Sequence, residues 1–240
     1  MTATPESPRA LAIMAHPDDA DFGAGGTLAT WVDEGFKVTL LLCTRGDQGG
    51  LEDAAIDEMP VVREREQRAA AAIIGITDVR FLDGYLDGWL EPTWELQREL
   101  VRVIRQVRPH RILCQSPERW YDRLFASHPD HLAAGEAAIR AIYPAAENPH
   151  AWPELLREEG LAAYRVPEIW LMAHPNPNHA VDITDVVDRK IAALRAHESQ
   201  TGHMGDALDD RIRGWGASFA AEAGLPKGRV AELFKRIVVG

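Results

Sequence analysis

The sequence predicts an α/β fold built on a mostly parallel sheet, and two observations support this class. Short apolar runs alternate with longer segments of helical periodicity along most of the chain. Clusters of histidine and aspartate directly follow two of the apolar runs, as expected for loops that leave the carboxyl ends of parallel strands. Alternation of strand and helix places helices on both faces of one sheet. We therefore expect a Rossmann-like three-layer sandwich whose functional site lies at the C-terminal edge of the strands.

The predicted elements follow from the pattern of apolar positions. The strand-like runs are Arg9–Ala15, Lys37–Thr44, Val79–Leu82, Arg111–Gln115 and Val166–Ala173. Helical segments lie between them at Gly26–Glu34, Val62–Ile74, Trp94–Val107 and Leu132–Ile142. The third helix is the clearest, because apolar residues recur at helical spacing and Pro109 follows its end. Gly75 stands where the preceding helix needs a left-handed cap.

The second half of the chain continues the same domain. Pro144–Pro167 reads as a long excursion with one short helix, and Ala173–Ala180 as a loop, because of its prolines and asparagines. We expect helices from Asp185 to about His197 and over Asp209–Ala223, then the apolar-alternating run Val230–Val239. Residues 1–8 are predicted to be a flexible N-terminal tail, and residues 9–240 a single domain.

Composition excludes several classes of protein. A chain of 240 residues with 46% apolar residues can bury a sizeable core. A net charge of -11 disfavours a nucleic-acid partner, which would need a basic surface. No apolar stretch approaches the ~20 residues that span a bilayer, so we expect no membrane insertion and a cytoplasmic location. Cys43 and Cys114 lie in apolar runs and are expected to be buried thiols. A homo-oligomer remains open.

The first cluster places one imidazole and three carboxylates at a strand end. His16 is followed by Pro17, which favours an extended backbone at His16, and then by Asp18, Asp19 and Asp21. Successive aspartates in a turn point in different directions, so one can bind a cation while its neighbour faces a water molecule. Grouped carboxylates without a cation would repel one another. The glycines at 23, 25 and 26 are expected to permit a tight turn before a helix at Thr27.

Two other interpretations of this cluster exist. A turn that caps the helix, with His16 as a core histidine, would need no ligand. Gly23-Ala24-Gly25-Gly26 after a strand also suggests a phosphate-binding loop. The spacing is not that of a dinucleotide loop, however, and the neighbouring carboxylates would repel phosphate.

The second cluster, Ser127–His131, favours a metal site over these interpretations. His128 and His131 are three residues apart across Pro129 at a predicted helix start, with Ser127 or His128 as the cap, so both imidazoles can face one crevice. Asp130 can hold one imidazole in the correct tautomer. The two clusters together supply two nitrogens and one oxygen for a three-ligand metal site, with an acid/base pair left over. A catalytic zinc hydrolase needs this set, although Fe²⁺ fits the same ligands.

These motifs resemble the PIG-L/LmbE-like zinc N-deacetylases, which include mycothiol- and bacillithiol-pathway deacetylases and the deacetylase of N-acetylglucosaminyl-phosphatidylinositol. The similar segments are Ala15–Ala29, Arg63–Glu66, Phe81–Gly88, His128–His131 and Val181–Gln200. The resemblance implies His16, Asp19 and His131 as zinc ligands, Asp18 as the general base and His128 as the group that stabilises the oxyanion. It also implies that Arg63 and Asp87, and less directly His197, reach the substrate.

The chain departs from the family pattern at two positions. Ala20 stands where members often have Glu, and Ala126 where some have a Tyr that assists the oxyanion. The predicted metal ligands are unchanged, so the departures bear on the substrate pocket.

Three functions are consistent with the sequence. The first is removal of an acetyl or similar acyl group from an N-acetylated amino-sugar conjugate, a small-molecule substrate. The second is an amidase or deacylase of the same family that acts on a thiol conjugate or a secondary metabolite. The third is a non-catalytic nucleotide-binding module that uses the glycine-rich segment.

Overall fold

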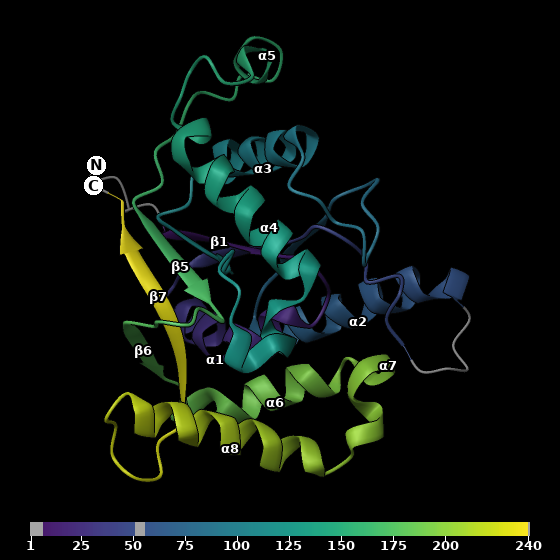
Figure 1. Ribbon diagram of the computed structural model, residues 1–240, viewed down its shortest axis with the longest axis vertical. Helices are drawn as coiled ribbons and strands as arrows, with labels where there is room; N and C mark the ends of the chain where they lie inside the picture. Colours follow the sequence, from purple (N-terminus) through teal and green to yellow (C-terminus); the bar gives the residue numbers. More distant parts are fainter. Residues whose placement is uncertain (1–6, 51–55, 240) are drawn as a thin grey trace, which may run out of the picture.

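The middle of the molecule is a mostly parallel sheet that is covered by helices on both faces (Figure 1). In this computed structural model, which describes residues 7–50 and 56–239, the strands have the order β3-β2-β1-β4-β5-β7-β6. The first five strands in this order are parallel, whereas β7 pairs antiparallel with both β5 and β6. The strands are β1 (Arg9–Met14), β2 (Lys37–Leu42), β3 (Asp78–Phe81), β4 (Arg111–Gln115), β5 (Glu168–Met172), β6 (His179–Asp182) and β7 (Ala231–Val238).

The helices form the two outer layers. The α-helices are α1 (Asp19–Asp33), α2 (Met59–Ile74), α3 (Trp94–Val107), α4 (Pro129–Arg140), α5 (Pro153–Arg157), α6 (Val187–Arg195), α7 (Glu198–Thr201) and α8 (Ala207–Glu222). Shorter helical turns are η1 (Ile56–Glu58), η2 (Tyr121–Ser127), η3 (Ala141–Ala146), η4 (Thr184–Val186) and η5 (Gly202–Met204).

The core divides according to the two faces of the sheet. Leu11, Leu41 and Ile112 pack with apolar residues of α3 and α4 on one face. Leu40 and Leu113 pack with α1, α2 and the end of α6 on the other. A third apolar cluster joins α6 to α8, which lie side by side in Figure 1. The predicted three-layer α/β sandwich is therefore confirmed.

Most predicted elements are present within a few residues. α3 and β4 have the predicted bounds, and Gly75 ends α2 with a left-handed φ of 99°. The excursion between residues 144 and 167 contains one short helix, α5. Cys43 and Cys114 are buried free thiols. In the described part of the chain, no helix is both long and apolar enough to cross a membrane. The predicted tail at residues 1–8 lies outside the described residues, except for Ser7 and Pro8.

The prediction for the glycine-rich segment was wrong. Helix α1 begins at Asp19 rather than near Thr27, so the glycines lie inside the helix. A Cβ on Gly23 would lie 2.5 Å from Met172 Sδ, and one on Gly26 would lie 2.7 Å from Ile183 side-chain atoms. The glycines therefore allow close packing of α1 instead of forming a turn. A phosphate-binding loop, and with it the nucleotide-binding hypothesis, loses its structural basis.

The loop predicted at Ala173–Ala180 is shorter than expected. Its last residues belong to β6, which begins at His179 and pairs with β7 in the register Ala180 to Leu233. β6 is a short edge strand, and its pairing depends on a strand that lies far along the chain. Its sequence therefore carries little strand periodicity of its own.

Candidate metal centre and active site

The junction between β1 and α1 positions the first cluster of acidic residues. The chain leaves β1, and Asp18 adopts a left-handed conformation with φ 77°, after which α1 begins at once. The Asp19 carboxylate bends back and accepts a hydrogen bond of 2.7 Å from the His16 backbone N–H. Acidic side chains in the first turn also suit the positive end of the helix dipole. The short connection between β1 and α1 therefore brings His16 and Asp19 into contact.

The N-terminus of α4 brings the second cluster to the same place. His131 Nε2 lies 2.9 Å from Asp19 Oδ1, and His16 Nδ1 lies 3.5 Å from Asp19 Oδ2. The imidazole rings of His16 and His131 have centroids 5.3 Å apart. One ring nitrogen from each of His16, His128 and His131 lies within 4.8 Å of the other two, which is close enough for a shared metal ion. These side chains form a cluster that can hold a divalent cation.

Charge pairing within this cluster is strong. Burial acts to raise the pKa of Asp19, but the imidazoles of His131 and His16 hold it well below its usual range. Gln115, at the end of β4, also donates a 2.8 Å hydrogen bond to Asp19 Oδ2. Asp19 is therefore a carboxylate at neutral pH, as a metal ligand must be.

His16 is oriented from its other side by two buried carboxylates. Its Nε2 lies 3.1 Å from Asp130 Oδ2 and 2.9 Å from Asp87 Oδ1. Burial lowers the pKa of His16, but hydrogen bonds with Asp130 and Asp19 outweigh it and raise the pKa overall. If a cation displaces the proton of Nδ1, the ring nitrogen on the Asp19 side, the proton on Nε2 can still point to the two carboxylates. Asp130 itself is fixed by the Gly88 and Leu90 backbone N–H groups, at 2.7 and 3.3 Å.

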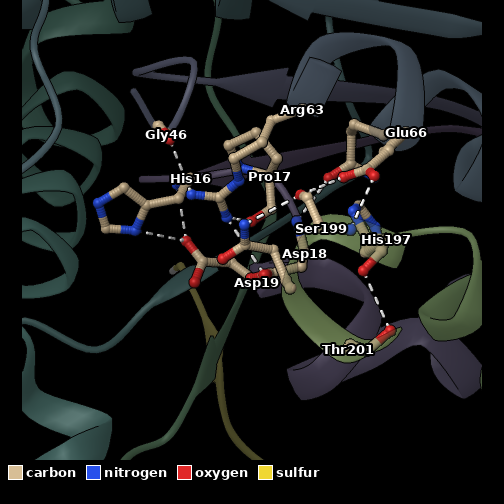
Figure 2. Close-up of polar contacts among 12 residues, drawn as sticks. His16, Pro17, Asp18, Asp19, Gly46, Arg63, Glu66, His197, Ser199 and Thr201 are labelled. Carbon is tan, nitrogen blue, oxygen red and sulfur yellow. Dashed lines mark hydrogen bonds and ion pairs between the residues drawn. The ribbon is translucent and has the colours of Figure 1, made fainter. Parts of the chain in front are cut away.

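Arg63 lies beside Asp18 and directs three hydrogen bonds into the protein (Figure 2). Its guanidinium donates to the backbone oxygens of Gly46 and Pro17, at 3.0 and 2.8 Å, and to Asp18 Oδ2 at 3.2 Å. Burial raises the pKa of Asp18 to about 6, and the positive charge of Arg63 opposes that shift. Arg63 also lines the cavity, but its hydrogen bonds hold Asp18 and the neighbouring backbone in place.

Asp87 and His197, which the sequence places near the substrate, contact other side chains of the protein. Asp87 lines the cavity, yet its carboxylate lies against His16 and 3.8 Å from Arg63 Nη1. His197 is fully buried and its Nε2 lies 3.0 Å from Asp21 Oδ2, so its imidazole supports the first turn of α1 rather than facing the cavity. Figure 2 shows His197 beside Glu66 and Ser199, away from His16.

His128 caps helix α4. Its Nδ1 accepts a 3.2 Å hydrogen bond from the Asp130 backbone N–H. Burial, together with the neighbouring imidazoles of His16 and His131, lowers the pKa of His128. The neutral imidazole with an accepting Nδ1 carries its proton on Nε2. His128 therefore offers an N–H donor at the cavity wall without a positive charge.

All the predicted metal and catalytic residues line one cavity of about 950 Å³. They are His16, Asp18, Asp19, His128 and His131. Sequence reasoning missed Gln115 and Gln67, although both had a positional signal. Gln115 stands at a strand end, and Gln67 lies one helical turn after Arg63, where it accepts from the Asp18 N–H and donates to Asp21. Helix α8 also lines the cavity, and no motif in its sequence indicates this.

The fold and the donor cluster define an α/β protein with a candidate metal centre at the ends of parallel strands. Residues 11–142 match the family GlcNAc-PI de-N-acetylase (PIG-L), and the chain belongs to this family.

Individual relatives agree with this assignment. The chain is 34% identical to diacetylchitobiose deacetylase of Thermococcus kodakarensis, over 80% of this chain and 70% of the relative. It is 32% identical to 1D-myo-inositol 2-acetamido-2-deoxy-alpha-D-glucopyranoside deacetylase of Rhodococcus erythropolis, over 82% of each chain. The structure of N,N'-diacetylchitobiose deacetylase from Pyrococcus horikoshii superposes with a TM-score of 0.85 at 28% identity, covering 97% of this chain and 85% of that one.

Proposed function

We propose that the protein is a metal-dependent N-deacetylase that hydrolyses the acetamide of an N-acetylated amino-sugar conjugate. The observation that carries this proposal is the convergence of His16, Asp19 and His131 beside Asp18 on the wall of one large cavity. The deacetylases named above support the reaction type and the class of substrate.

The residues fit a catalytic metal ion by their chemistry. Two imidazoles and one carboxylate are a donor set typical of catalytic zinc sites. Asp19 is held as a carboxylate, and His16 is oriented from behind by Asp130, as metal-binding histidines commonly are. A divalent cation held by His16, Asp19 and His131 supplies Lewis acidity, which polarises an amide carbonyl and makes water a better nucleophile. We propose Zn²⁺ as this ion, and Fe²⁺ suits the same donors.

Asp18 is the proposed general base. It is next to the ligand Asp19 in sequence, faces the same cavity and is held by Arg63. It takes a proton from the attacking water and gives that proton to the amine nitrogen as the C–N bond breaks, so that the leaving group departs as a neutral amine. The products are acetate and the free amino sugar. Burial raises the pKa of Asp18 to about 6, which suits a group that must both accept and give up a proton near neutral pH.

His128 is the proposed donor to the carbonyl oxygen. The hydrogen bond from the Asp130 N–H to Nδ1 leaves the proton of a neutral ring on Nε2. That N–H stabilises the negative charge that develops on oxygen as water adds to the carbonyl. The ring acts in its neutral form, because burial and two neighbouring histidines lower its pKa.

The proposal is tested by acetate release from N-acetylglucosamine conjugates. Protein stripped with a chelator should be inactive, and stoichiometric Zn²⁺ should restore the rate. The Asp18→Asn protein, loaded with metal in the same way, is the control that keeps the metal ligands but lacks the general base. It should release almost no acetate. Turnover that survives complete metal removal would contradict the proposal, as would full activity of the control. The cytoplasmic location and the assembly state stay predictions.

A further inference from the structure

The cavity is larger than the reacting groups require. Its volume of about 950 Å³ lies near the top of the range of about 300–1,000 Å³ that is usual for small-molecule sites. The groups that would hold the metal and the acetamide come from the loops after β1 and β3 and from the start of α4. The rest of the wall comes mainly from α8, η2, Phe22 of α1, the end of β5 and the loop after it, and the start of β7. This second part of the wall has no role in the chemistry proposed above.

The second part of the wall is apolar and rich in aromatic rings. Its main members are Phe22, Met172, Ile212, Trp215, Phe219 and Leu233. The Trp215 side chain is 43% exposed although it lines the cavity, so it retains surface that a ligand can cover. Gly216 lets α8 approach β7 closely, since a Cβ there would lie 2.2 Å from Val230 Cγ1. The apolar wall is therefore a built part of the cavity.

The charged groups of this region are mostly matched within the protein. Lys190 and Glu232 form a buried ion pair, and the Glu232 carboxylate also accepts hydrogen bonds from the Gly26 and Thr27 N–H groups. His174 Nε2 lies 3.3 Å from Glu118. The Arg123 guanidinium lies over the rings of Trp120 and Phe219, at 4.7 and 5.1 Å from their centroids, and links η2 to α8. Apart from the Arg123 guanidinium, which stacks on aromatic rings, this wall suits an uncharged group better than a carboxylate or a phosphate.

The part of the substrate that meets this wall follows from the chemistry of the relatives' named substrates. Diacetylchitobiose and the myo-inositol conjugate both carry acetyl on nitrogen, and they differ in the group attached to the sugar. Both attached groups are rich in hydroxyls, whereas the wall here is apolar.

We propose that the substrate is an N-acetyl amino sugar that bears an apolar or aromatic aglycone, and that Trp215 and Phe219 of α8 form the aglycone subsite. This inference rests on the proposed deacetylase function and adds the class of substrate to it. An aromatic ring on the aglycone stacks against the indole and the phenyl ring and is removed from water together with them.

The test compares phenyl and methyl 2-acetamido-2-deoxyglucopyranosides, both anomers, with Zn²⁺-loaded protein. The phenyl glycoside of the productive anomer should have a kcat/KM about tenfold or more above that of the methyl glycoside. Trp215→Ala and Phe219→Ala should each bring this ratio towards one, because each lowers kcat/KM for the phenyl glycoside more than for the methyl glycoside. Trp94→Ala is the matched control, because Trp94 is 74% exposed and is not among the residues that line the cavity. It should keep the wild-type ratio.

Further substrates separate other sources of the same preference. A methyl glycoside with N-hexanoyl in place of N-acetyl tests whether the wall accepts the acyl group instead. A glycoside with a carboxylate in its aglycone tests whether Arg123 selects an anion. A larger gain from either substrate than from the phenyl glycoside overturns the proposal, as do equal rates for phenyl and methyl glycosides.

Binding distinguishes failure of the subsite from failure of the proposed function. Phenyl 2-amino-2-deoxyglucopyranoside, the expected product, is titrated calorimetrically into metal-free wild type and Trp215→Ala protein. Tighter binding to wild type, with no acetate released from any substrate, would support the subsite and refute the deacetylase. Equal binding to both proteins would overturn the subsite whatever the rates.

Discussion

Asp18 is a partly buried acid beside the buried cation of Arg63, and the balance between burial and this positive charge sets the pKa of Asp18. Burial raises the pKa of Asp18, and the Arg63 guanidinium, with Nη2 3.2 Å from Oδ2, holds that rise in check. The general base works only as the carboxylate. Activity is therefore lost as pH falls through the pKa of Asp18, and any change that raises this pKa moves the loss to higher pH.

Arg63→Met tests this balance. Removing the positive charge should move the acid limb of kcat/KM up by about one pH unit or more, because an opposite charge at this distance typically lowers a carboxyl pKa by one to three units. Arg65→Met, at an exposed position on the same helix, should leave the limb in place. The measurement is the pH profile of kcat/KM for both variants. An unmoved limb in Arg63→Met would show that another group titrates there.

His128→Ala tests the proposed oxyanion donor. Loss of one such donor typically raises the barrier by about 3 kcal/mol, so kcat should fall roughly a hundredfold or more. Bound metal should stay at the wild-type level, because His128 is not one of the proposed ligands. His150→Ala, at an exposed position, is the control. A near-normal kcat with full metal content would remove His128 from the mechanism.

At the scale of residues, the sequence predicts those members of the site that stand in short contiguous motifs. His16, Asp19 and His131 stand in two short clusters after strands, and the structure brings them together. The roles of Arg63 and His197 could not be predicted in the same way, because they depend on burial and on partners elsewhere in the chain. Arg63 faces Gly46, Pro17 and Asp18, and His197 faces Asp21.

At the scale of elements, the glycines of α1 fix how closely this helix packs. Gly26 lies inside the helix with the side chain of Ile183 where a Cβ would go. Glu232 packs against the same helix, and its carboxylate accepts hydrogen bonds from the Gly26 and Thr27 N–H groups. Periodicity could not predict this, because glycine in a short window indicates a turn as readily as a close helix contact.

A pair of Gly→Ala substitutions separates packing from helix propensity. Gly26→Ala should lower the free energy of unfolding by about 1–3 kcal/mol, because its Cβ would overlap Ile183 and force a shift in packing. Gly214→Ala in α8 should raise it by about 0.5–1 kcal/mol, since no described atom lies within 4 Å of that Cβ and alanine favours the helix. Urea unfolding of both variants gives the comparison. Stabilisation by Gly26→Ala would mean that α1 does not pack as closely as the structure indicates.

At the scale of the whole molecule, the parallel sheet makes the site from distant parts of the chain. β1 lies between β2 and β4, so the loop after β1 and the segment after β4 leave neighbouring strands at one edge. This part follows from the strand pattern and could be predicted. The apolar wall from α8 could not, because it depends on the packing of α8 against α6 and the start of β7 in three dimensions.

The central claim is that His16, Asp19 and His131 share one divalent cation while Asp18 remains free to act as a base. Calorimetric titration of Zn²⁺ into metal-free protein tests it most directly. Wild type and Asp18→Asn should each bind one ion per chain with similar affinity, whereas Asp19→Ala should bind it more than about a hundredfold more weakly. Wild-type affinity in Asp19→Ala, or loss of the ion in Asp18→Asn, would contradict the account.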